Sequence, residues 1–289
     1  MHIPDGFLSA PVWAGLATVS VPSIGMLARR AQAGLQDTRL PLMGVMGAFV
    51  FAAQMINFPV GIGTSGHLVG GALLAATLGP APAAIVMTAI LTIQALVFQD
   101  GGLLALGANV FNMAIAGVLA GYWPYRLLAR TRGRRVGIAL GGFLSVFVSA
   151  LLCLGELLLS GIHIPKHALG IGLIVFCITA LLEGAITLAV LGSLEKMNPR
   201  WLRAPETEGR PALILLGLLA LVLVSAGFLA ASALPDGLER VAGLAGLNGA
   251  APATVEPWLR QAGMGLAGLT ATFLACYLVG RWIVRWRNA

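Results

Sequence analysis

Long apolar runs separated by short polar stretches dominate this chain of 289 residues. Nine such segments can be marked, at roughly 7–28, 40–57, 67–79, 82–98, 103–124, 136–160, 167–192, 211–233 and 262–284. Most of them approach the ~20 residues that a helix needs to cross the hydrocarbon core of a bilayer. The pattern therefore predicts an all-α integral membrane protein, a polytopic bundle of about nine transmembrane helices.

The third segment, 67–79, is short for a complete span. Backbone at membrane depth must satisfy its hydrogen bonds inside the protein. We therefore expect this segment to be tilted, or partly re-entrant and covered by its neighbours.

Composition supports the bilayer as the surrounding medium. Hydrophobic residues make up 58% of the chain and charged residues only 10%, whereas soluble domains carry about 25% charged residues. The 38 glycines fit a membrane bundle, in which small residues allow helices to approach closely. The three cysteines lie inside apolar runs without metal-binding spacing, so we expect small buried hydrophobes rather than a disulfide.

The basic residues predict the orientation. They cluster in alternate polar stretches, and if the N-terminus lies outside, all but Lys166, Arg240 and Arg260 fall on the inner side. Inner loops of membrane proteins are enriched in Lys and Arg, so we expect the N-terminus outside and the C-terminus inside. This distribution explains the formal charge of +7 as a topology signal and gives no reason to expect nucleic acid as a partner.

The polar stretch 195–210 contains two prolines and several charges, and it divides the chain. We expect a seven-helix body at 1–194, an inner linker at 195–210 and a two-helix segment at 211–289 with an outer loop at 234–261.

The triplet Pro-Asp-Gly occurs at 4–6 and at 235–237, both on the outer side, and is typical of tight turns. No basic region precedes the first apolar run, so a cleavable signal peptide is not expected.

The most specific chemical feature is histidine at position 2. The amine of Met1, the amide nitrogen of His2 and its imidazole Nδ1 can close two fused chelate rings around one metal ion. Such a planar nitrogen set suits Ni(II) or Cu(II). Because the amide must lose its proton, binding should depend strongly on pH.

His67 is the candidate for the fourth nitrogen. It ends the Gly-rich outer stretch 57–67, and it is the other histidine at the same predicted boundary as His2. Asp100 is expected to orient a ligating imidazole. Asn57 and Ser65 in the same stretch, and Asn109 and Asn112 on the fifth segment, are expected to support the ligands. A structural hydrogen bond between helices is an equal alternative for the two segment asparagines.

Other polar residues within or beside the apolar segments carry less information. His163 and His167 flank Pro165 and are expected to be ordinary interfacial residues. Glu156 and Glu183 could mark an ion path, but a structural role is preferred because each is a single carboxylate without a nearby basic partner. No phosphate-binding loop, nucleophile elbow or His-Glu-x-x-His motif is present in the sequence, so it predicts neither ATP hydrolysis nor another catalytic activity.

Three motifs resemble one known family: Met-His-Ile-Pro-Asp-Gly at 1–6, Asn-Phe-Pro-Val-Gly-Ile-Gly-Thr-Ser-Gly-His at 57–67, and Phe-Gln-Asp-Gly-Gly-Leu-Leu-Ala-Leu-Gly-Ala-Asn-Val-Phe-Asn-Met at 98–113. They are similar to the substrate-specific membrane component (CbiM/NikM family) of nickel/cobalt energy-coupling factor transporters, over roughly residues 1–200. Pro-Asp-Gly-Leu-Glu at 235–239 resembles the signature of the accessory subunit of these systems, which is fused to the body in some members.

The resemblance implies that Met1, His2 and His67 bind the transported Ni²⁺ or Co²⁺, with no resident cofactor. It also implies a transmembrane coupling protein and cytoplasmic ATPases as partners, in the cell (inner) membrane. Nickel is favoured over cobalt, because a deprotonated amide in a square of nitrogens suits Ni(II). A cobalt importer that feeds cobalamin synthesis, a carrier or channel that works alone, and a membrane enzyme or sensor remain alternatives.

Overall fold

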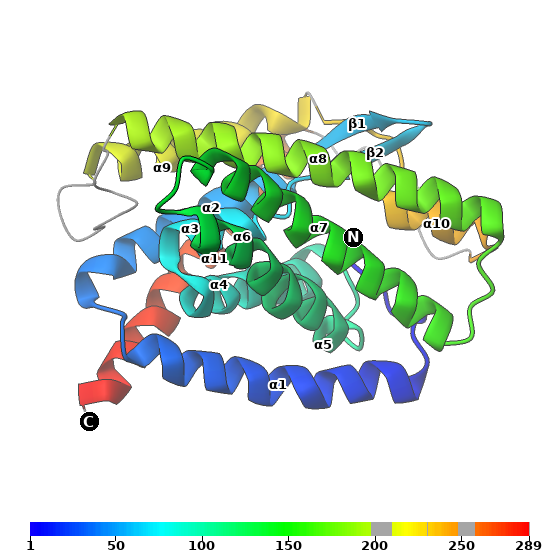
Figure 1. The fold of residues 1–289 in the computed structure, drawn as a ribbon, viewed down its shortest axis with the longest axis horizontal. Coiled ribbons are helices and arrows are strands. Elements are labelled where there is room, and N and C mark those ends of the chain that lie inside the picture. Colours follow the sequence, from blue (N-terminus) through cyan, green and yellow to red (C-terminus); the bar gives the residue numbers. More distant parts are fainter. Residues whose placement is uncertain (198–209, 230, 248–257, 289) are drawn as a thin grey trace.

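The computed structural model describes residues 1–197, 210–229, 231–247 and 258–288, and these are mostly helical (Figure 1). The helices are α1 (Ala10–Gln32), α2 (Leu40–Gln54), α3 (Gly71–Leu78), α4 (Pro80–Ile93), α5 (Leu106–Asn109), α6 (Val118–Leu128), α7 (Arg134–Leu159), α8 (Lys166–Met197), α9 (Arg210–Ala226), α10 (Gly237–Leu244) and α11 (Trp258–Asn288). Two wider π-helical stretches, Gln94–Phe98 and Val110–Gly117, extend α4 and join α5 to α6. The strands β1 (Asn57–Gly61) and β2 (Thr64–His67) form one hairpin.

Six helical stretches in the described residues are long and apolar enough to cross a membrane. They are Ala10–Gln32, Pro80–Phe98, Leu106–Leu128, Arg134–Leu159, Lys166–Lys196 and Arg260–Trp286. The other three predicted segments correspond to the shorter helices α2, α3 and α9. The multi-pass helical architecture therefore agrees with the sequence, while the total of nine spans and the orientation of the termini stay predictions.

The short third segment is covered on all sides. Every residue of α3 is buried, and this helix contacts α4, α6 and α7. Gly79, with a positive φ of +85°, separates α3 from α4, which begins with proline. Protein rather than lipid thus surrounds this short helix, as expected for a partly re-entrant segment.

Helix α1 runs along one edge of the molecule and α8 along the opposite edge (Figure 1). Large apolar side chains such as Val21 and Met26 on α1 and Leu181 on α8 are exposed, which is typical of surfaces that face lipid. The first residues of the chain turn inward from α1 and reach the middle of the bundle (Figure 1). Met1, His2 and Ile3 are buried there.

The predicted linker at 195–210 is only partly described. Helix α8 continues through Met197 and α9 begins at Arg210, while 198–209 lie outside the described residues. The C-terminal segment packs closely on the body, because α9 and α11 both contact α2. The division into body, linker and two-helix segment therefore remains a prediction about the chain's organisation.

The outer stretch 234–261 was expected to be a loop, and this expectation was wrong for 237–244, which form α10. The reason is a capping box: the Asp236 side chain accepts a hydrogen bond from the backbone of Glu239, and the Glu239 side chain accepts one from the backbone of Asp236. Residues 248–257 of the same stretch lie outside the described part of the chain.

The Gly-rich stretch 57–67 is a β-hairpin rather than an irregular loop. Asn57 pairs with His67, and the turn between the strands places Gly61, Ile62 and Gly63 in the left-handed region. The C-terminal segment adds to this hairpin, since the backbone of Ser65 forms a parallel bridge with Asp236. The amide of Ser65 donates to Pro235 O at 2.9 Å and its hydroxyl to Leu234 O at 2.7 Å.

Candidate metal centre

Two side chains, one asparagine and one aspartate, hold the N-terminal peptide in the bundle. Asn109 forms a two-way clamp with Ile3: its Oδ1 accepts from the Ile3 amide at 2.8 Å and its Nδ2 donates to the Ile3 carbonyl at 3.1 Å. Asp5 accepts hydrogen bonds from the backbone amides of residues 103–105 just before α5. These contacts fix the direction in which His2 and Met1 continue.

Two glycines allow this close approach. Gly101 has φ +93°, and a Cβ there would lie 3.1 Å from Asn109 Nδ2 and 3.2 Å from His2 Cβ. A Cβ on Gly102 would overlap the carboxylate of Asp5. The pair Gly101-Gly102 is therefore required by the N-terminal peptide that packs on it.

His67 presents one nitrogen to the N-terminus. Its Nδ1 lies 2.9 Å from the carbonyl oxygen of Leu68. A carbonyl only accepts, so Nδ1 carries the proton and Nε2 carries a lone pair. Nε2 lies 3.1 Å from the amine nitrogen of Met1. When a histidine binds a metal through one ring nitrogen, its other ring nitrogen commonly donates a hydrogen bond to a backbone carbonyl, which fixes the orientation of the ring.

Burial, followed by the positive charge of the Met1 amine, lowers the pKa of His67 to about 4. The imidazole is therefore neutral near pH 7. A neutral imidazole is the form that can bind a metal ion.

The ring of His2 stacks on that of His67, with centroids 5.4 Å apart and planes 10° apart. Its Nδ1 lies 3.1 Å from Oδ1 of Asp100, whose side chain is half exposed. Its Nε2 is buried and has no hydrogen-bond partner among the described residues. Asp100 thus contacts Nδ1, the nitrogen that the chelate would use. Partial loss of hydration works against ionisation of Asp100, but the charge of His2 and the hydrogen bond with it outweigh this effect and lower the pKa of the carboxyl.

Asp236 reaches the same centre from the start of α10. Its Oδ2 lies 2.8 Å from the Met1 amine, with side-chain exposures of 6% for Met1 and 18% for Asp236. Burial alone lowers the pKa of the amine, but the Asp236 carboxylate outweighs it and the net shift is upward. Burial alone raises the pKa of Asp236, and the amine reverses that shift. The C-terminal segment therefore supplies the counter-charge of the N-terminus.

The arrangement matches the donor set of a cation that prefers nitrogen. Two nitrogens bound at right angles to one metal, each at ~2.0–2.1 Å, lie about 2.9 Å apart. The 3.1 Å between the Met1 amine and His67 Nε2 is close to this separation. Three or more His, Cys, Asp or Glu side chains do not gather around a common point in the described residues. The nitrogens that meet at this point include the terminal amine of Met1.

The structure places Met1, His2, His67 and Asp100 close together, while their role as a metal site stays a prediction. Among the supporting candidates, Asn109 holds Ile3 and Ser65 holds the C-terminal segment. Asn57 lies opposite His67 in the hairpin. Asn112 donates to Glu156 on α7 at 2.9 Å, which is the helix–helix hydrogen bond given as its alternative.

Sequence reasoning missed three supporting groups. Asp5 and Asp236 are the central residues of the two Pro-Asp-Gly triplets, so the repeat on one predicted face was the available signal. Glu183 of α8 accepts from the amides of Val69 and Gly70, both at 2.8 Å, two and three residues after His67. Nothing in the sequence links Glu183 to these residues, because the contact joins positions more than a hundred residues apart.

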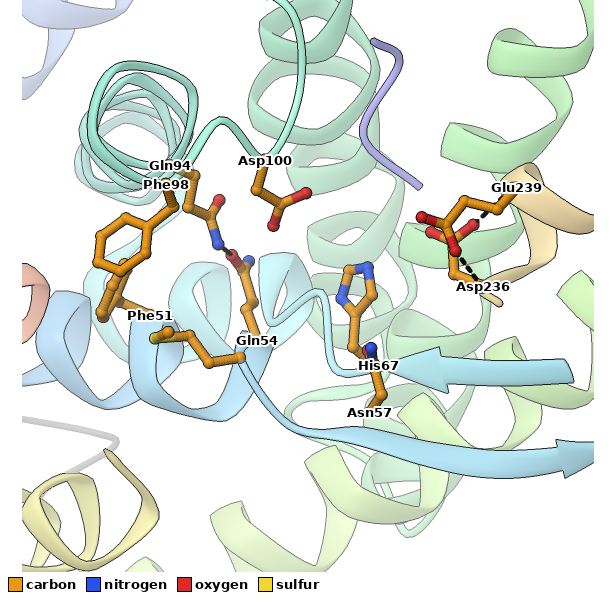
Figure 2. Close-up of a pocket in the computed structure, with 10 residues that line it drawn as sticks. Phe51, Gln54, Asn57, His67, Gln94, Phe98, Asp100, Asp236 and Glu239 are labelled. Atoms are coloured by element: carbon orange, nitrogen blue, oxygen red, sulfur yellow. Dashed lines mark hydrogen bonds between the residues drawn. The ribbon is translucent and has the colours of Figure 1, made fainter. Parts of the chain in front are cut away.

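A cavity of about 250 Å³ opens beside His67 (Figure 2). Asp100 lies on one side of it and Asp236 with Glu239 on the other, with His67 between them (Figure 2). Gln54 and Gln94 line the side next to Asp100. The nitrogen donors are thus enclosed by protein, with an acidic opening next to them.

Apolar helices surrounding a buried cluster of nitrogens define a membrane protein with an internal site suited to a cation. A family model described as the cobalt uptake substrate-specific transmembrane region, CbiM, matches residues 2–201. The chain belongs to this family, and it is a multi-pass membrane component of nickel/cobalt transport rather than an enzyme.

Relatives extend the similarity into the C-terminal segment. One relative comes from Archaeoglobus fulgidus, and its name describes it as a fused nickel transport protein, NikMN. It is 34% identical to this chain over 96% of both chains. The fused nickel transport protein NikMN of Rhodobacter capsulatus is 31% identical over 78% of this chain and 71% of its own length. A crystal structure of a truncated transition metal transporter superposes with a TM-score of 0.60 at 34% identity, covering 68% of this chain and 99% of that one.

Proposed function

We propose that the chain is the metal-capturing membrane subunit of an ATP-driven, energy-coupling factor importer, with nickel as the preferred cargo. The ion is held at the outer face by the Met1 amine, the amide and imidazole of His2, and Nε2 of His67. Asp100, Asn109 and the hairpin residues Asn57 and Ser65 support these ligands.

The observation that carries the proposal is the contact between Met1 and His67. The lone pair of His67 Nε2 is directed at the terminal amine from 3.1 Å, deep in the protein and 66 positions away in the sequence. This pairing supports His67 Nε2 as the fourth nitrogen next to the proposed N-terminal chelate. A metal ion between them would displace one proton from the terminal ammonium and one from the His2 amide, both released to solvent. It would also replace the contact of His2 Nδ1 with Asp100 by a metal–nitrogen bond.

The preference for nickel rests on the amide ligand. A deprotonated main-chain amide in a square of nitrogens suits Ni(II) and Cu(II) better than the divalent ions earlier in the first transition row. The relatives that match both the body and the C-terminal segment include proteins named for nickel transport. Copper binds such nitrogens more tightly still, so supply in the cell contributes to selectivity.

Energy for transport is assigned to separate chains, because the sequence has no phosphate-binding loop. A transmembrane coupling protein and cytoplasmic ATPases would use ATP hydrolysis to reorient or move the bundle and release the metal inside. The membrane-embedded glutamates Glu156 and Glu183 bond to an asparagine and to backbone amides, which supports structural roles rather than those of a stand-alone carrier.

Uptake of radioactive nickel by cells tests this function. The chain expressed alone should accumulate little metal, while co-expression with the coupling protein and ATPases of the same system should give uptake that stops when ATP is depleted. A variant of the ATPases without their catalytic glutamate is the matched control. Full uptake by this chain alone, lost with an uncoupler but not with ATP depletion, would instead establish a secondary carrier.

A further inference from the structure

The nitrogen donors of the proposed site are too enclosed for a hydrated ion to reach them directly. Met1, His2 and His67 expose only 7%, 8% and 7% of their surfaces. The cavity beside His67 is lined by Asp100 and Asp236, which contact His2 and Met1 respectively. The cavity therefore reaches His67 directly, and it also reaches the two carboxylates that contact His2 and Met1.

The opening is acidic in a chain that is basic as a whole. Asp100, Asp236 and Glu239 contribute three carboxylates to its wall, while the formal charge of the chain is +7. The capping box fixes two of these carboxylates side by side, with Glu239 Oε2 accepting from the Asp236 amide at 2.9 Å. Carboxylates grouped in a cleft raise the local concentration of cations and their rate of association.

An unpartnered oxygen also faces this cavity. Gln54 Nε2 donates to the carbonyl of Val69 at 2.6 Å, so Gln54 Oε1 must be the atom that accepts from Gln94 Nε2 at 2.8 Å. This chain of bonds leaves the Oε1 of Gln94 without a partner in the described residues, although only 2% of the residue is exposed. Figure 2 shows that this oxygen is turned toward Asp100.

Burying an acceptor without a partner is costly, typically by about 1–3 kcal/mol. Gln94 lines the cavity, and its oxygen can accept a hydrogen bond from a water molecule that a cation carries. The acidic wall and this oxygen are two independent features that suit the same ligand, a hydrated divalent cation.

We propose that the cavity is a docking site in which the hydrated divalent cation is held by Asp100, Asp236, Glu239 and the Gln94 carbonyl oxygen before it moves to the nitrogen ligands. This inference rests on the function proposed above. The carboxylates and the amide oxygen accept hydrogen bonds from metal-bound water, and the waters are then replaced one by one as His67, Met1 and His2 bind. The site thus raises the rate of capture and contributes no ligand to the final nitrogen complex.

The test is the rate of Ni²⁺ association with the purified full chain, measured by stopped-flow absorbance. Glu239→Gln removes one charge from the cavity but keeps a side chain that can complete the capping box. At low ionic strength we expect the association rate constant to fall about threefold or more, since steering by charged clefts changes on-rates by tenfold and above. The dissociation rate and the final nickel spectrum should not change.

The matched control is Asp37→Asn, which also removes one carboxylate but lies before α2, at the far end from Gln54. The 15 residues of α2 separate the two positions by about 22 Å. The control should associate at the wild-type rate. The difference between Glu239→Gln and wild type should disappear near 1 M salt, where the screening length is only ~3 Å.

Gln94→Met is the second variant, of similar size but without the acceptor, and it should also slow association while leaving the final spectrum intact. Equal association rates for wild type, Glu239→Gln and Gln94→Met would overturn the docking site. If the wild-type chain fails to bind nickel through nitrogen at all, the proposed function fails instead, so the two failures are distinguishable.

Discussion

The amine of Met1 lies 2.8 Å from Oδ2 of Asp236, across 235 positions of sequence. The first residue of the chain, just before the family-matched region 2–201, and the start of α10 in the C-terminal segment therefore share one buried ion pair. The backbone bridge between Ser65 and Asp236 ties the same segment to the strand that carries His67. The C-terminal segment is consequently a part of the candidate metal centre.

This ion pair predicts how the stability of the metal-free protein depends on pH. The pKa of the amine is raised from 8.0, so the contribution of the pair is complete below pH 8 and is lost as the pH rises through the folded value. The pKa of Asp236 is lowered from 3.8, so the contribution is also lost as the pH falls through its folded value. Stability should therefore form a plateau between these limits.

Asp236→Asn should lower and flatten that plateau. Removing one partner of a buried ion pair typically lowers the free energy of unfolding by about 3–5 kcal/mol. The loss should be smaller here, because the unpaired amine can release its proton and become neutral. Thermal unfolding in detergent with a chelator present, measured across pH, provides the check, with Asp37→Asn as the control. Parallel pH profiles for Asp236→Asn and the wild type would contradict the assigned role.

The low pKa of His67 predicts that this residue releases no proton when nickel binds at pH 6. With a pKa of about 4, the imidazole is already neutral there. His67→Gln should weaken nickel binding by about tenfold or more, because even an outer partner of a metal ligand contributes ten- to hundredfold. The number of protons released should nevertheless equal that of the wild type.

Calorimetry at pH 6 in two buffers of different ionisation enthalpy measures this number. One additional proton released by the wild type relative to His67→Gln would show that the imidazole is protonated in the metal-free state. Equal affinities for the two proteins would remove His67 from the ligand set.

Gly102→Ala tests the packing of the N-terminal peptide. An added Cβ would overlap the Asp5 carboxylate and displace the turn that leads to His2. Overpacking of this kind costs about 1–3 kcal/mol, and nickel affinity should fall because the amine and His67 Nε2 move apart. Gly155→Ala on α7, where a Cβ meets no atom within 4 Å, is the matched control and should leave nickel affinity and thermal stability near wild type. Unchanged nickel affinity in Gly102→Ala would show that the position of the peptide does not control the site.

The sequence predicted the helical membrane architecture well because hydropathy reports directly on the bilayer. The candidate ligands Met1, His2 and His67 could also be named from the sequence, since His at position 2 and the Gly-rich stretch before His67 have local chemical signatures. The roles of Glu183, Gln94 and Asp236 were not accessible in the same way. Their hydrogen bonds join distant segments, and only the packing of α8, α4 and α10 around the N-terminal peptide creates them.

Helix α10 shows how a local pattern can be misread. Its surroundings are rich in Gly, Ala and Pro, which predicts a loop, but Asp236 and Glu239 have the spacing of a capping box. The apolar residues Leu238, Val241 and Ala242 are buried, where α10 contacts α8 and β2. Tertiary contacts, together with one good cap, stabilise a helix of only eight residues.

The most direct test of the central claim is calorimetric titration of Ni(II) into the purified full chain and into a form with one extra residue before Met1. The extension keeps every side chain but moves the terminal amine away from His67 and from the chelate of His2. A chain extended by one residue at its C-terminus is the control. We predict that the N-terminal extension weakens nickel binding by more than about hundredfold. This loss exceeds the ten- to hundredfold loss of affinity that follows removal of a residue supporting a metal ligand. The control should bind nickel as the wild type does. Equal binding by both extended forms would show that the metal site lies elsewhere.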